Sequence, residues 1–114
     1  MEFNFKKNGN LIIIYLKGRL DVHHSAEIEK ELGRLITMES ASNFLLNMKD
    51  VEYISSSGLR IIVLARRILG DKKRKLVLCN INSAIRKIFD VVQLTDMFSI
   101  FDSESEAVES MDKG

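Results

Sequence analysis

The side chains best placed for chemistry in this sequence are three consecutive serines at positions 55–57. They are followed by Gly58 and the apolar run LRIIVLARRIL. One serine suffices to cap a helix, because its hydroxyl oxygen accepts a hydrogen bond from a backbone N–H of the first turn. A serine there can also carry a phosphate, since the free N–H groups and the positive end of the helix dipole favour an anion. The serines therefore either cap the helix only or form a phosphorylation site, whose added charge of about −1.5 to −2 would change the surface and spare the fold.

Two charged residues are candidates to take part in such a site. Asp21 ends a predicted strand near the serines, where it either caps the next helix or contacts a partner. Arg60 follows the serines by one helical turn, where it either holds the phosphate or helps to dock the partner. The neighbouring His23 and His24 suggest metal binding, but adjacent helical residues point about 100° apart and no acidic residue or cysteine stands at ligand spacing. We therefore expect no metal ion and no cofactor.

A hydrolase and a nucleic-acid-binding protein are the alternatives to a binding switch. A hydrolase would need Ser56, a histidine and Asp21 as a triad, but the Gly-x-Ser-x-Gly turn is missing and both histidines lie in one short loop. The basic stretch between positions 60 and 75 could bind nucleic acid, yet its charges are interleaved with an apolar helix face, no aromatic residue accompanies them, and the net charge is only +1. We therefore expect neither an enzyme nor a nucleic-acid-binding protein.

The basic stretch ends in four consecutive cations, Lys72, Lys73, Arg74 and Lys75. Long cationic side chains are rarely buried without a partner, because removing the charge from water is costly. The four residues are therefore predicted to form an exposed turn between a helix and a strand.

The composition is that of one globular domain. The chain has 114 residues, of which 46% are hydrophobic and 29% charged, so we expect residues 1–114 to form a single domain with its own core. Cys79 is the one cysteine and lies in the strand-like run KLVLCN, which predicts a small buried side chain in a reducing compartment. The longest early apolar run, LIIIYL, is too short to cross a membrane, so we expect a cytoplasmic protein.

The hydrophobic pattern divides the chain into strands and helices. Asn8-Gly9 suits a tight hairpin turn, so the first two strands should be antiparallel. The predicted strands cover residues 2–7, 11–18, 43–48, 75–81 and 98–101. The predicted helices begin near Ser25, at Gly58, after Asn82 and after Ser103, and the second is expected to bury Ile61, Ile62, Ala65, Ile68 and Leu69. Strand–helix–strand units with short loops imply an α/β fold: a mixed sheet of four to five strands, with about four helices packed mainly on one face.

Three motifs together resemble the STAS-domain family, specifically its small stand-alone bacterial anti-sigma factor antagonists. GRLD at 18–21 is similar to the family's Gly-x-Leu/Ile-Asp, and SSSGL at 55–59 is similar to its Asp-Ser-Ser-Gly-Leu. The third motif is the segment from LVLCNIN to SEAV at 76–108, which follows the family's strand, helix, short strand and final helix. Because the likeness covers almost the whole chain, it implies a STAS-like single domain.

The resemblance implies a partner and a switch. Proteins of this family bind an anti-sigma factor that is also a serine kinase, and thereby free a sigma factor. The kinase phosphorylates the first serine of Asp-Ser-Ser-Gly, which falls on Ser56 here, while Ser55 replaces the aspartate and leaves Ser57 and Ser55 as alternative acceptors. The partner surface would then comprise Asp21 and residues 55–60, including Leu59 and Arg60, and a phosphatase could reverse the modification. The alternative within the family is a non-switching scaffold or a regulatory subunit of a larger signalling or transport complex; the oligomeric state is open.

Overall fold

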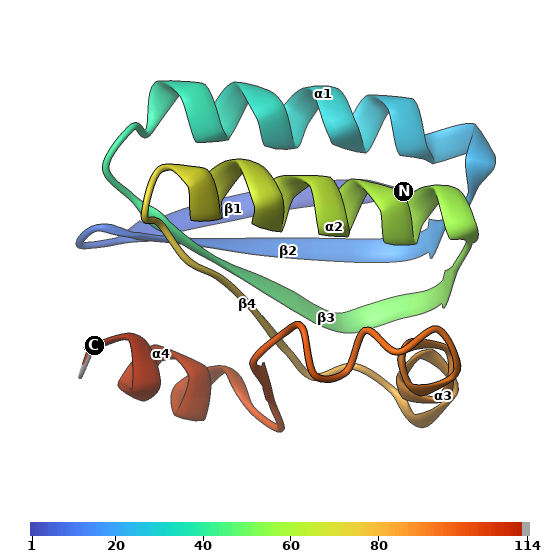
Figure 1. Ribbon diagram of the computed structural model, residues 1–114. Coiled ribbons are helices and arrows are strands. Elements are labelled where there is room, and N and C mark those ends of the chain that lie inside the picture. Colours follow the sequence, from blue (N-terminus) through green and yellow to red (C-terminus); the bar gives the residue numbers. More distant parts are fainter. Residues whose placement is uncertain (113–114) are drawn as a thin grey trace.

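The computed structural model describes residues 1–112 and has the predicted order of elements. Within that range the strands are β1 (Glu2–Asn8), β2 (Leu11–Leu20), β3 (Asn43–Ile54), β4 (Leu76–Cys79) and β5 (Ile100–Phe101). The helices are α1 (Val22–Met38), α2 (Ser56–Asp71), α3 (Ser83–Val91) and α4 (Glu104–Asp112). The strands form one sheet in the order β1-β2-β3-β4-β5, antiparallel between β1 and β2 and parallel elsewhere (Figure 1). This confirms the predicted mixed sheet.

The central strands of the sheet are buried on both faces, because successive residues point to opposite sides and helices cover each side. On one face, Ile12 and Ile14 of β2 join the larger core cluster with α1 and α2, which lie side by side over the sheet (Figure 1). Helix α3 adds Ile85 and Phe89 to the same cluster. On the other face, Ala107 of α4 packs in a smaller cluster with side chains of β2, β3 and β4. Three of the helices described, α1, α2 and α3, thus contribute side chains to the larger core cluster.

Polar contacts hold the start of α4 against that second face. Glu104 accepts a hydrogen bond from the side chain of Asn47 at 3.0 Å and forms an ion pair with Lys6 at 3.8 Å. Partial desolvation on its own would raise the pKa of the Glu104 carboxyl. Hydrogen bonds from Tyr15 and Asn47, together with the charge of Lys6, outweigh it and hold the pKa below its usual value.

Several boundaries differ from the predicted ones. Helix α1 begins at Val22 and not near Ser25, since Asp21 caps it, and α2 spans 56–71 rather than 58–69. Strand β3 runs on to Ile54, whereas β4 and β5 are shorter than predicted. Ile68 is predicted to be buried, but its exposed fraction is 46%, because the face of α2 that packs on the core includes Leu69 and not Ile68.

Arg74 is where the sequence-based prediction is wrong. Lys72, Lys73 and Lys75 are exposed as expected, but Arg74 is only 8% exposed. Its Nε donates to the Ser42 carbonyl at 2.7 Å, its Nη1 donates to Ile36 at 3.2 Å, and its Nη2 donates to Glu39. These carbonyls lie at or just beyond the end of α1, where no further helical turn supplies N–H donors. An arginine can be buried here without a carboxylate because its fork of donors meets three backbone acceptors.

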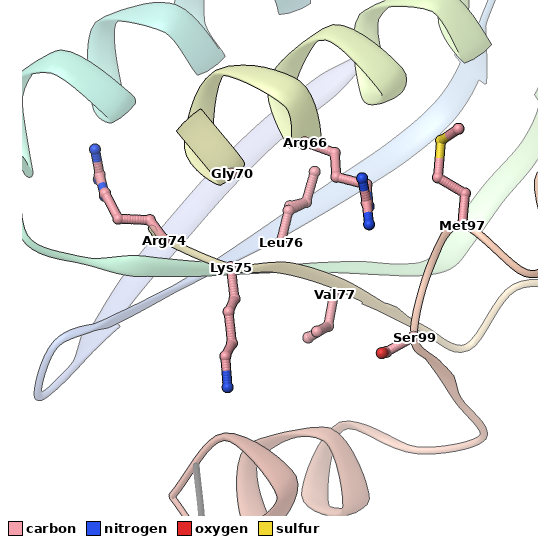
Figure 2. Close-up of a pocket in the computed structure, with 8 residues that line it drawn as sticks. All are labelled: Arg66, Gly70, Arg74, Lys75, Leu76, Val77, Met97 and Ser99. Atoms are coloured by element: carbon pink, nitrogen blue, oxygen red, sulfur yellow. The ribbon is translucent and has the colours of Figure 1, made fainter. Parts of the chain in front are cut away.

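Figure 2 shows that Arg74 and Lys75 leave the start of β4 in opposite directions.

Among the described residues, no helix combines the length with the apolar character that crossing a membrane requires.

Candidate functional site: the serine turn at the start of α2

The three serines lie in the turn between β3 and α2, at the carboxyl end of a central strand. The Ser55 N–H donates to the Leu20 carbonyl at 2.9 Å, which ties the turn to the end of β2. The Ser55 hydroxyl accepts from the Gly58 N–H at 3.2 Å, so Ser55 is the N-cap of α2. The cap that the sequence predicted is therefore supplied by the first serine alone.

Ser56 is the first residue of α2 and is exposed. Within residues 1–112 its hydroxyl makes no hydrogen bond to another side chain or to the backbone, whereas the hydroxyl of Ser55 is occupied by capping. Ser57 is partly buried. Ser56 thus combines accessibility with the free N–H groups and positive dipole end of a helix start, where an added phosphate is well tolerated.

Gly58 sets how closely α2 approaches β2. A Cβ at this position would lie 2.7 Å from Leu20 Cγ, 2.9 Å from Ile54 Cγ1 and 2.9 Å from the Leu20 carbonyl oxygen. The carbonyl belongs to the backbone and cannot move aside as the end of a side chain can. The glycine of the motif is therefore required by packing, independently of any partner.

Asp21 follows β2, and the pairing of Leu20 with Ile54 places it beside the serine turn on the neighbouring strand. Its carboxylate accepts from the His23 N–H at 3.0 Å and contacts His24 Nδ1 at 2.8 Å, which confirms the capping role. Desolvation on its own would raise the pKa of the Asp21 carboxyl, but the bonds from His24 and His23 outweigh it and hold the pKa below its usual value. The capping role does not exclude a partner contact, which stays a prediction.

Arg60 lies one turn beyond Ser56 on the surface of α2. Its Nη2 is 3.5 Å from Glu29 Oε1 of α1, and both side chains are largely exposed, so this ion pair is weak. Leu59 is partly buried against the core. Neither residue is held so tightly that the fold would stop it from contacting a partner.

A hollow of about 350 Å³ opens beside the serine turn. It is lined by Ser56, Leu59, Arg60, Val63, Leu64, Arg67, Val92 and Leu94. The sequence reasoning found Ser56, Leu59 and Arg60 but missed the other five. These five residues carry little sequence signal of a shared site, since only the tertiary contact between α2 and the segment after α3 brings them together.

Two further features bear on ligand binding, the acidic and histidine side chains and a second hollow. Among the described residues, no group of three or more His, Cys, Asp or Glu side chains could hold a metal ion. A second hollow of about 300 Å³ lies near the end of α2. Figure 2 shows Arg66 and Lys75 on different sides of β4 there, so their charges do not converge on one anion.

A mixed five-stranded sheet with helices on both faces defines a small α/β protein, with a capped serine turn at the start of α2 and an open hollow along that helix. The chain belongs to the STAS domain family, whose model matches residues 2–107. The resemblance predicted from the three motifs is thereby confirmed.

Characterised relatives cover nearly the whole chain. The anti-sigma F factor antagonist of Paenibacillus polymyxa is 21% identical over 112 residues, which are 98% of this chain and 96% of the relative. The anti-sigma-B factor antagonist of Bacillus subtilis is 27% identical over 100 residues, covering 88% and 90% of the two chains. These names describe regulatory binding and not a catalysed reaction, in agreement with the expectation of a non-enzymatic protein.

The fold matches solved structures equally well. The Bacillus protein SpoIIAA in its phosphorylated form superposes with a TM-score of 0.76 at 22% identity, covering 96% of this chain and 99% of that chain. The superposition confirms that this order of strands and helices is the family fold.

Proposed function

We propose that this protein is an anti-sigma factor antagonist whose binding is switched by phosphorylation of Ser56. It binds an anti-sigma factor that is also a serine kinase and thereby releases a sigma factor. The kinase then places a phosphate on Ser56, the complex dissociates, and a phosphatase restores binding. The names of the relatives support the general role. The observation that carries the switch is the exposed, unbonded hydroxyl of Ser56 beside a Ser55 that already caps α2.

The division of labour between the two serines supports Ser56 as the acceptor. The Ser55 oxygen already accepts from the Gly58 N–H in a partly buried residue, whereas the Ser56 hydroxyl is exposed and can take a phosphate without disturbing the cap. The negative charge on Ser56 meets the dipole of α2 favourably, so the fold is spared while the surface that a partner contacts changes sign. Recognition is thus altered without unfolding the domain.

The test is phosphorylation by the anti-sigma factor kinase of the same organism with ATP, followed by mass spectrometry of the serine turn. We expect one phosphate, on Ser56. Ser56→Ala should abolish phosphorylation and keep binding, while Ser56→Asp should fold normally and bind much more weakly. Phosphate that persists in Ser56→Ala would move the acceptor to Ser55 or Ser57.

The second candidate is a non-switching scaffold or a regulatory subunit of a larger complex. Ser55 favours it, because this serine stands where the family's motif has an aspartate. If Ser55 only replaces the aspartate as a cap, Ser55→Asp should preserve or improve phosphorylation of Ser56. If no kinase modifies any of the three serines, and Ser56→Asp binds as well as the wild type, the scaffold is the correct function.

A further inference from the structure

Helix α2 carries apolar side chains that the core covers only in part. Its core face consists of Ile61, Ile62, Ala65 and Leu69, with Gly58 at the start. Leu59 and Val63 lie on a neighbouring face and are only partly buried, and Leu64, also partly buried, lies beyond Arg60 around the helix. Across the hollow lie Leu94, which is partly buried, and Val92, which is 48% exposed. The walls are thus apolar, open to solvent and continuous with Ser56.

The rim of the hollow is basic. Arg60 and Arg67 line it, and no acidic residue lines it within the described part of the chain. Arg60 has only its weak, exposed contact with Glu29, and Arg67 forms no ion pair with another residue of 1–112. Because the two arginines are separated by two helical turns, they stand about 10 Å apart along the axis of α2.

We propose that the hollow binds an amphipathic helix of the partner whose apolar face is flanked by carboxylates. A helix carries side chains at i and i+7 about 10 Å apart, which matches the two arginines, and its residues at i+3 and i+4 would meet Leu59, Val63 and Val92. Opposite charges at the rim steer and orient the helix, while the apolar walls provide most of the binding energy.

The same geometry supplies a reason for the switch, and this inference rests on the function proposed above. Ser56 and Arg60 are four residues apart on α2 and line the same hollow, so a phosphate on Ser56 would lie within reach of Arg60. The phosphate would both neutralise that end of the basic rim and repel the partner's carboxylates. One modification thus removes an attraction and adds a repulsion.

The first experiment compares two adjacent valines by measuring the affinity for the anti-sigma factor. Val92 lines the hollow, whereas Val91 is 82% exposed and does not. We expect Val92→Asp to weaken binding at least tenfold and Val91→Asp to change it less than twofold, with both variants keeping the wild-type circular dichroism and melting temperature. Equal effects of the two substitutions, or none from Val92→Asp, would place the partner elsewhere.

The second experiment reverses one charge on the rim and one away from it. Arg67→Glu should weaken binding at least tenfold and flatten its dependence on salt, because an attraction is replaced by a repulsion. Lys72→Glu, also exposed but outside the hollow, is the control and should have less than a threefold effect. Wild-type affinity in Arg67→Glu contradicts an acidic partner.

A third experiment separates this inference from the function on which it rests. If the wild-type protein binds no anti-sigma factor, the proposed function fails, but the hollow can still be probed with a synthetic amphipathic helix of leucine and glutamate. We expect this peptide to shift the backbone amide signals of Leu59, Val63 and Val92. A peptide with lysine in place of glutamate should not shift them. Equal shifts from both peptides, or none from either, overturn the proposal.

Discussion

Replacing Arg74 by methionine tests whether one buried cation fastens the end of α1 to the sheet. Methionine retains much of the apolar stem but removes the three donors that reach the carbonyls of Ile36, Glu39 and Ser42. The guanidinium also lies 5.6 Å from the ring centre of Phe44. The substitution therefore removes the donors from a site that is only 8% exposed.

The loss can be estimated from those contacts. A hydrogen bond to a charged group contributes about 1.5–3 kcal/mol, and a buried carbonyl left without a partner costs about 1–3 kcal/mol. Part of this is offset, since Arg74 no longer has to be desolvated and water can reach the partly exposed Glu39. We expect a net loss of about 3 kcal/mol, a large share of the roughly 5–15 kcal/mol that stabilises a domain.

Urea unfolding followed by circular dichroism measures this loss, which corresponds to a fall in melting temperature of about 12 °C. Lys75→Met is the matched control, because the neighbouring cation is exposed, and it should change stability by about 0.5 kcal/mol or less. Arg74→Lys should recover less than half of the loss, since one ammonium cannot reproduce the fork of the guanidinium. If Arg74→Met is no less stable than the control, the reasoning about the buried contacts is wrong.

Other predictions concern packing, the thiol and pH. Gly58→Ala should destabilise the domain by about 1–3 kcal/mol in the same urea assay, because its methyl group would collide with the backbone oxygen of Leu20. Burial raises the pKa of the Cys79 thiol to about 12, so a thiol reagent at pH 8 should leave it unmodified in the native state and react after unfolding. The lowered pKa of Glu104 means that its charge stabilises the fold above the unfolded-state value of about 4.3, and that this contribution is lost as the pH falls through the folded-state pKa. The stability of Glu104→Gln, measured from pH 7 to 3, should therefore decline less steeply than that of the wild type.

Ser55 and Ser56 form a further matched pair, because only the first is a cap. Ser55→Ala should cost about 0.5–2 kcal/mol, whereas Ser56→Ala should change stability by about 0.5 kcal/mol or less. The reverse order in urea unfolding would contradict the capping geometry on which the choice of acceptor rests.

Features encoded within a few neighbouring residues could be predicted from the sequence alone. Asn8-Gly9 marked the hairpin, and Gly9 has the positive φ of +63° that such a turn favours. The buried residues of α1 are spaced at i, i+4, i+7 and i+8, so the helical period alone indicates its core face: Ile28, Leu32, Leu35 and Ile36. The serine–glycine motif located the turn at the start of α2, and the order of strands and helices indicated a mixed sheet. Each of these rests on the short repeats of helix and strand or on a local turn preference, so a stretch of sequence is enough.

Only the tertiary structure decided which long or apolar side chains were covered by distant parts of the chain. From the sequence alone, Arg74 is predicted to be one of four exposed cations. Its burial depends on carbonyls of residues 36–42, more than thirty positions earlier. Ile68 belongs by spacing to the core face of α2 but stays exposed, because nothing in residues 1–112 packs fully over it. Val92 and Leu94 join Ser56 in one hollow only because the segment after α3 returns to α2. Burial and proximity of this kind depend on how the elements pack together, which no local pattern of residues records.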